Sequence, residues 1–114
     1  MALPPCYLYF QFFVEGDDLH MFVVQRSGDV LLGIPYDIAL FAQIQLYIAE
    51  QTGYKASKLE VQIIDAHIYK NQIDAVKQYL EQETFLSPEY TYKDGKLEIK
   101  NYQHGPKITA AVAV

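Results

Sequence analysis

The hydrophobic pattern of the chain predicts strands first, with a long apolar helix between them. Residues 7–15 (YLYFQFFVE) and 19–26 (LHMFVVQR) are rich in aromatic and β-branched side chains, and a turn-type segment at 16–18 separates them. This composition predicts an antiparallel hairpin. Residues 58–64 (KLEVQII) predict a third strand.

A helix is predicted at Tyr36–Thr52, after the break at Gly33-Ile34-Pro35 and before Gly53. Its apolar residues point in nearly every direction around the helix: Ile38, Leu40, Phe41, Ile44, Leu46, Tyr47 and Ile48. Because a helix that is apolar all round is usually buried, we expect this one at the centre of the core.

The last third predicts smaller elements. Asn71–Glu83 carries Ile73, Val76 and Leu80 on one stripe, which indicates an amphipathic surface helix. Asp94-Gly95 interrupts residues 91–99 and predicts a second hairpin. With no repeat or linker, we expect one α+β domain over 1–114: a mixed β-sheet with a buried central helix.

The first two strands do not alternate cleanly between polar and apolar positions, which indicates burial on both faces. Two arrangements explain this equally well. A second copy of the chain covers one face, or a helix covers one face and another part of the protein covers the other.

Composition narrows the function. The chain has 114 residues, 51% of them hydrophobic, and a formal net charge of −5, so a nucleic-acid-binding surface is not expected. Its single cysteine excludes an intrachain disulfide. We find neither a signal peptide nor an apolar run of the ~20 residues that a membrane span needs. We therefore expect a soluble cytoplasmic protein.

Four groups of polar residues lie at the edges of the apolar segments: Cys6, residues 25–29 (QRSGD), Asp37, and His67 with Tyr69. Taken singly, each has an ordinary structural explanation. A cysteine among aromatic residues is usually buried as a small hydrophobe. An aspartate near a helix start usually interacts with the helix dipole.

Their order along the chain is more specific. Pro-Pro-Cys opens a strand, Gln-Arg-Ser-x-Asp ends the next, Leu-Gly-x-Pro-aromatic-Asp-Ile-Ala opens the helix, and Asp-Ala-His-Ile-Tyr follows the third strand. Together with Asn-Tyr-Gln-His-Gly-Pro-Lys-Ile and the closing Ala-Val-Ala-Val, this pattern resembles the thymidylate synthase family over essentially the whole chain. The resemblance implies the C-terminal, nucleophile-bearing half of such an enzyme.

The resemblance implies C5 one-carbon transfer to a pyrimidine deoxynucleotide, with 5,10-methylenetetrahydrofolate as co-substrate and no metal. The Cys6 thiolate would add to C6 of the base, with Arg26 lowering the thiol pKa. The expected catalytic residues are Cys6, Arg26, Asp29 and Asp37. The expected substrate-binding residues are Gln25, Arg26, Ser27, Gly28, Asp29, Asp37, His67, Ile68 and Tyr69.

Within that set, Arg26 and Ser27 match the family's phosphate ligands, and a planar guanidinium pairs two phosphate oxygens at once. His67 and Tyr69 match the pair that holds the sugar 3′-hydroxyl. The positions that match the folate site are Asp29, Leu32, Gly33, Tyr36 and Ala113, the last in the tail that closes over the folate.

Two positions depart from the family pattern. The residue after the nucleophile is commonly His, whereas here it is Tyr7. Thymidylate synthases carry Asn at the position of Asp37, and deoxycytidylate hydroxymethylases of the same superfamily carry Asp.

Asp37 favours cytosine on chemical grounds. Cytosine presents a donor at N4 and an acceptor at N3, so a carboxyl group accepts from N4 and, when protonated, donates to N3. Opposite uracil, an ionised carboxylate would face the O4 acceptor. An unmet buried polar group costs about 1–3 kcal/mol, more if charged, which corresponds to roughly tenfold to several-hundredfold discrimination. The alternative explanation of Asp37 is a helix cap.

The resemblance also implies a preceding half that supplies a general-base Glu, folate-packing Trp residues and further phosphate-binding arginines. We therefore expect the chain to be a fragment with little activity alone; the alternative is a natural half-length protein. A homodimer through strands 7–14 and 19–24 is expected. The alternatives to a dCMP enzyme are a thymidylate synthase fragment acting on dUMP and a non-catalytic half-domain that dimerises and binds nucleotide.

Overall fold

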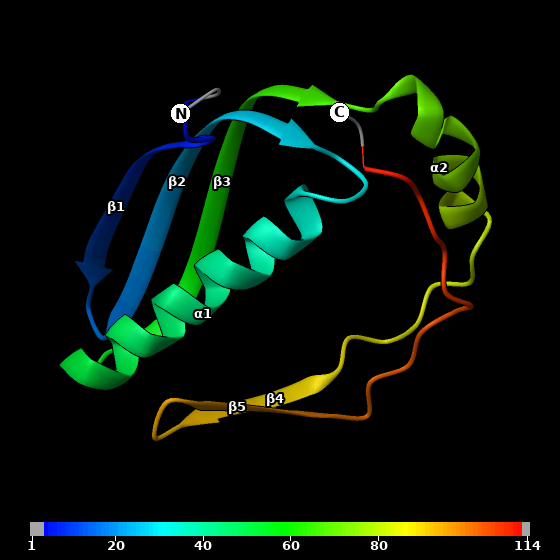
Figure 1. The fold of residues 1–114 in the computed structure, drawn as a ribbon. Helices are drawn as coiled ribbons and strands as arrows, with labels where there is room; N and C mark the ends of the chain where they lie inside the picture. The colour runs from blue at the N-terminus through cyan, green and yellow to red at the C-terminus, as the bar shows by residue number, and fades with distance from the viewer. Residues whose placement is uncertain (1–3, 113–114) are drawn as a thin grey trace. The chain divides into compact units, whose positions relative to one another are not determined.

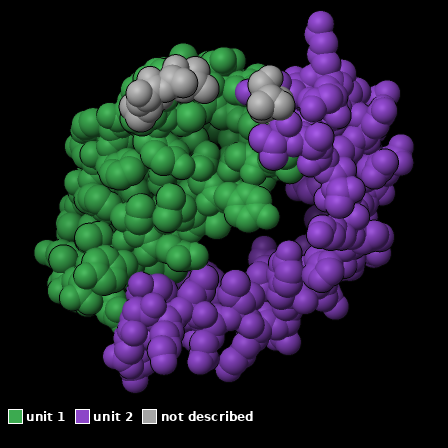
Figure 2. All heavy atoms as spheres, in the orientation of Figure 1, with its two compact units in different colours: residues 1–67 green, residues 68–114 purple. Residues whose placement is uncertain are grey.

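The computed structural model describes residues 4–112, which divide into two compact units that meet in sequence at His67 and Ile68 (Figure 2). The predicted folate contact at Ala113 lies outside the described residues.

Unit 1 contains a three-stranded mixed sheet in the order β1-β2-β3. Strand β1 (Tyr7–Glu15) pairs antiparallel with β2 (Asp18–Asp29), and β3 (Lys55–His67) pairs parallel with β2. The hairpin and the mixed sheet are confirmed. The second and third strands are longer than predicted, so residues 27–29 and 65–67 lie on strands and not after them.

Helix α1 (Ile34–Thr52) lies against one face of this sheet (Figure 1). The centre of the core is formed by Met21, Val23 and Phe41, all at most 1% exposed. Partly buried side chains from the sheet and the helix surround them: Phe12, Ile44, Leu59 and Val61.

The prediction that α1 is buried on all sides is wrong for unit 1. Its buried residues are Phe41, Gln45 and Ala49, spaced four apart on one face. Leu40 and Tyr47 are 46% and 50% exposed. The reason is that the sheet covers one side of the helix and no other element of unit 1 covers the opposite side. The expected two-sided burial of the first strand is likewise absent from this unit, since eight of the nine residues of β1 are exposed.

A buried polar residue, Gln45, fastens α1 to the sheet. Its Nε2 donates to Leu19 O at 2.9 Å and to Lys58 O at 3.0 Å. The register of the parallel β2–β3 pair shifts between Leu19 and Met21. An interrupted ladder leaves backbone carbonyls in need of a partner, and the amide supplies a donor to one carbonyl from each strand.

Unit 2 contains the 3-10 helix η1 (Lys70–Gln72), helix α2 (Ile73–Leu80) and a hairpin of β4 (Glu89–Lys93) and β5 (Lys96–Lys100). The hairpin turn at Asp94-Gly95 is confirmed, with φ of 52° and 72°.

The predicted amphipathic helix is only partly right. Helix α2 has eight residues, and η1 precedes it. Ile73 and Leu80, predicted on its apolar stripe, are 45% and 74% exposed, because little of unit 2 packs against them. Among the described residues, no helix is long and apolar enough to cross a membrane.

Candidate functional site

Strand direction in unit 1 gathers the predicted site residues at one edge of the sheet (Figure 1). The parallel strands β2 and β3 both end there, and the antiparallel β1 begins there. Helix α1 starts at the same edge, because residues 30–33 connect it directly to the end of β2. The edge therefore collects Cys6, residues 25–29, Asp37 and His67.

Arg26 holds the segment around the exposed Cys6. Its backbone N–H donates to Cys6 O at 2.8 Å. Its guanidinium donates from Nε to Pro5 O at 3.0 Å and from Nη2 to Pro4 O at 2.7 Å. Arg26 is therefore joined to the segment 4–6, and its predicted effect on the Cys6 thiol stays a prediction. These two contacts leave most guanidinium N–H donors for an anion such as phosphate.

An irregularity in β1 determines where Tyr7 points. Tyr9 pairs with Val24, but Tyr7 pairs with the next residue, Gln25, so β1 contains one extra residue at this place. Because side chains alternate between the two faces of a strand, the extra residue turns Tyr7 toward the face that carries α1. Its ring contacts Phe41 edge to face, with centroids 5.3 Å apart.

Asp37, in the first turn of α1, is half-buried and accepts two side-chain hydrogen bonds. Tyr7 Oη donates to its Oδ1 at 2.7 Å, and Gln25 Nε2 donates to its Oδ2 at 2.5 Å. The hydrogen bond to Asp37, followed by burial and by the charges of Asp37 and Cys6, raises the pKa of Tyr7 to about 12. Tyr7 is thus a hydroxyl donor at neutral pH.

The turn between β2 and α1 is closely packed. A Cβ on Gly28 would lie 2.8 Å from Ile34 Cγ1, so only glycine allows this approach. Asp29 Oδ1 accepts from Leu31 N at 3.0 Å and from Leu32 N at 3.1 Å. Asp29 therefore organises this turn, and its expected contact with folate stays a prediction.

The other predicted folate residues lie around the same turn. Gly33 N donates to Asp29 O at 3.0 Å, and Gly33 O accepts from Asp37 N at 3.0 Å. Leu32 is half-buried, and Tyr36 is 76% exposed at the start of α1. These residues adjoin Asp37, and their role as a wall beside the base stays a prediction.

His67 is the last residue of β3 and pairs with Asp29 on β2; two residues earlier, Asp65 pairs with Ser27. The backbone O of His67 accepts from Val30 N at 2.9 Å, and His67 Nδ1 lies 3.2 Å from Asp65 O.

The two remaining residues of the predicted sugar site, Ile68 and Tyr69, fall in unit 2. Tyr69 O accepts from Gln72 N at 2.9 Å and so caps η1. The role of this segment in binding the sugar stays a prediction.

The contact between Tyr7 and Asp37 was not predicted from the sequence. Tyr7 and Asp37 were recognised as separate departures from the family pattern, whereas the structure joins them. The extra residue in β1 has no local signal in an aromatic-rich strand, since every residue from 7 to 10 suits a strand.

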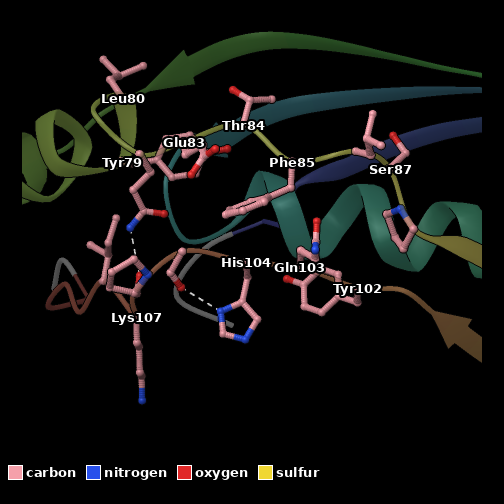
Figure 3. Close-up of a pocket in the computed structure, with 16 residues that line it drawn as sticks. Tyr79, Leu80, Glu83, Thr84, Phe85, Ser87, Tyr102, Gln103, His104 and Lys107 are labelled. Carbon is pink, nitrogen blue, oxygen red and sulfur yellow. Dashed lines mark hydrogen bonds between the residues drawn. The ribbon is translucent and has the colours of Figure 1, made fainter.

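Residues 4–112 contain no group of three or more His, Cys, Asp or Glu side chains arranged to hold a metal ion. An open groove in unit 2 lies between residues 79–88 and 102–108, where Gln82 Nε2 donates to Pro106 O at 2.9 Å (Figure 3). None of the predicted site residues lines this groove.

Comparison with known proteins shows the family of the chain. The family model of thymidylate synthase matches residues 1–114. Thymidylate synthase from Mycoplasma genitalium is 37% identical over 123 aligned residues, which cover 100% of this chain and 43% of that protein. The structure of thermostable thymidylate synthase A from Bacillus subtilis matches with a TM-score of 0.91 and 35% identity, covering 100% of this chain and 45% of that one.

The chain belongs to the thymidylate synthase family. The expected fold is also confirmed by the structural match. The chain spans less than half the length of these two relatives.

Proposed function

We propose that the chain carries the nucleophile and the base-recognition residues of an enzyme that transfers a one-carbon unit to C5 of a pyrimidine deoxynucleotide monophosphate, with methylenetetrahydrofolate as the donor. The main support is that Cys6, Arg26 and Asp37 meet at one edge of unit 1.

In this reaction the Cys6 thiolate forms a bond to C6 of the base, and the electron pair of the C5–C6 double bond moves to C5 and, in cytosine, through C4 toward N3. C5 then attacks the methylene carbon of the folate, and the bond from that carbon to one folate nitrogen breaks. Loss of the C5 proton and breaking of the second carbon–nitrogen bond release the folate and leave an exocyclic methylene on C5. Addition of a hydride from the released folate, or of water, to that methylene expels the Cys6 thiolate from C6 and restores the C5–C6 double bond. Arg26 supports the thiolate electrostatically, and its remaining donors suit the substrate phosphate.

Cytosine is the proposed base because of Asp37. Both carboxyl oxygens already accept from donors, which matches the acceptor character of a carboxylate. The N4 amine of cytosine would supply one more donor. As negative charge develops toward N3, a proton shared between N3 and the carboxyl group stabilises the transition state. The O4 of uracil would instead place an acceptor against an acceptor.

The experiment is a comparison of kcat/KM for dCMP and dUMP in the protein expressed from its complete reading frame. We expect the wild type to prefer dCMP and Asp37→Asn to shift the ratio toward dUMP by roughly tenfold to several-hundredfold. The alternative of a helix cap is wrong, because Gly33 occupies the N-cap position of α1 and Asp37 lies within its first turn. An Asp37 that served only as a structural acceptor for Tyr7 and Gln25 would leave the ratio unchanged. A wild type that prefers dUMP would instead support the thymidylate synthase alternative.

We further propose a homodimer through the sheet face opposite α1, in a protein that acts in the cytoplasm. Tyr9 and Phe13 point to that face in register with Val24 and His20, and they are 48% and 49% exposed. Covering such rings with a second copy would remove apolar surface from water. Light scattering at micromolar concentration is expected to give the mass of a dimer, and a well-folded monomer would contradict this proposal.

A further inference from the structure

We propose that Tyr7 is a positioning residue that sets the base preference by holding Asp37 as a hydrogen-bond acceptor. This inference rests on the proposed function, because it concerns how the same site distinguishes cytosine from uracil. Tyr7 acts through Asp37 and needs no contact with the nucleotide itself.

Tyr7 is held in a fixed position. The extra residue in β1 turns it toward α1, and its ring edge-packs against Phe41, which is fully buried. The backbone of β1 and this ring contact hold the phenol oxygen 2.7 Å from Asp37 Oδ1. The hydroxyl therefore donates directly to Asp37 from a ring whose position is fixed by the backbone of β1 and by Phe41.

Gln25 is fully buried and donates to the other carboxyl oxygen of Asp37. The Oε1 atom of Gln25 has no hydrogen-bond partner among residues 4–112. A buried amide oxygen without a partner is unfavourable. The amide nevertheless keeps the orientation that leaves Oε1 unpaired, because this orientation directs its N–H at the Asp37 carboxylate.

The Tyr7 phenol is protonated at neutral pH. With its pKa raised to about 12, the Tyr7 hydroxyl keeps its proton throughout the neutral range and directs it at Asp37. Donors thus approach the carboxyl group from Tyr7 and from Gln25. A third partner at the base edge is favoured when it is also a donor, as the exocyclic amine of cytosine is.

The test measures the ratio of kcat/KM for dCMP to kcat/KM for dUMP in wild type, Tyr7→Phe, Asp37→Asn and the double variant. The protein is expressed from its complete reading frame. Tyr7→Phe keeps the ring against Phe41 and removes only the hydroxyl. Tyr9→Phe is the matched control, since Tyr9 Oη donates to Gln11 Oε1 on the same strand and not to Asp37.

We expect Tyr7→Phe to lower the dCMP-to-dUMP ratio by about tenfold, as for loss of one hydrogen bond to a charged group. It should have no further effect on the ratio in the Asp37→Asn background, and Tyr9→Phe should leave the ratio unchanged. A normal ratio in Tyr7→Phe, together with a shifted ratio in Asp37→Asn, would overturn the role of Tyr7 and leave the proposed function standing. An unchanged ratio in Asp37→Asn would overturn both the dCMP assignment and the role of Tyr7.

A spectroscopic measurement tests the contact without any turnover. With tyrosine labelled by ¹³C at Cζ, the Tyr7 signal is assigned by its absence in Tyr7→Phe. We expect this phenol to titrate near the raised pKa of about 12 in wild type and closer to the ordinary 10.0 in Asp37→Asn, because Asp37 causes most of the rise. A wild-type phenol that titrates near 10.0 would contradict the hydrogen bond and with it the inference.

Discussion

Gln45 offers a sharp test of how α1 is held on the sheet, because the same helix carries an exposed glutamine at position 43. Gln45 is 4% exposed and donates to one carbonyl on β2 and one on β3. Gln45→Met keeps the length of the side chain and its helix propensity but removes both donated hydrogen bonds.

The expected cost follows from those two carbonyls. A buried acceptor that loses its donor costs about 1–3 kcal/mol. The carbonyl of Lys58 is only partly buried, and the added apolar burial of Met offsets part of the loss. We therefore expect Gln45→Met to lower the free energy of unfolding by about 2–3 kcal/mol. Gln43→Met should stay within about 0.5 kcal/mol of wild type, as exposed substitutions usually do.

Urea unfolding followed by circular dichroism measures both variants. We expect Gln45→Met to unfold at a lower urea concentration than wild type, with an unchanged m-value. Equal midpoints for Gln45→Met and Gln43→Met would refute the claim that this amide fastens the helix to the two strands.

Two further predictions concern the edge of the sheet. Gly28→Ala places a Cβ 2.8 Å from Ile34 Cγ1, so urea unfolding should show that the free energy of unfolding falls by about 1–3 kcal/mol. Adding Ile34→Ala should remove most of this loss, and a double variant with no such relief would contradict the close approach. The raised pKa of Tyr7 stabilises the fold fully below its unfolded value of 10.0, and this contribution is lost as the pH rises through about 12. Between neutral pH and about pH 11, wild type should therefore lose more unfolding free energy than Tyr7→Phe, and equal losses would contradict the raised pKa.

Local patterns were sufficient to predict most elements of the fold. The hairpin at Asp94-Gly95 depends on the backbone preferences of two residues, and both adopt the positive φ that such turns need. The aromatic strands 7–15 and 19–26 and the break at Gly16 likewise gave the first hairpin, whose pairing the structure confirms.

Burial was harder to predict, because it depends on what lies against an element and not on the element alone. Leu40 and Tyr47 gave α1 an apolar surface all round, but only the face of Phe41 meets the sheet of unit 1. No sequence pattern marks Gln45 as buried, since its amide is accommodated by the strand carbonyls beside the register shift at Leu19.

At the candidate site, the residue types were recognisable from motifs, and their connections were not. Cys6 and Arg26 were both expected at the site, and a backbone hydrogen bond joins them. The contact between Tyr7 and Asp37 depends on one extra residue in β1, which changes the face on which Tyr7 lies. A register irregularity of this kind arises from pairing between strands, so a single strand sequence does not reveal it.

The central claim is that the Cys6 thiolate adds to C6 of a cytosine nucleotide and activates C5. Exchange of the C5 hydrogen of dCMP in D₂O, followed by proton NMR, measures that activation most directly, because a C5 carbanion-like adduct takes up deuterium before the thiolate leaves. The protein from the complete reading frame is expected to catalyse the exchange, and Cys6→Ser is expected to abolish it while still binding dCMP. Exchange that persists at the wild-type rate in Cys6→Ser would contradict the account.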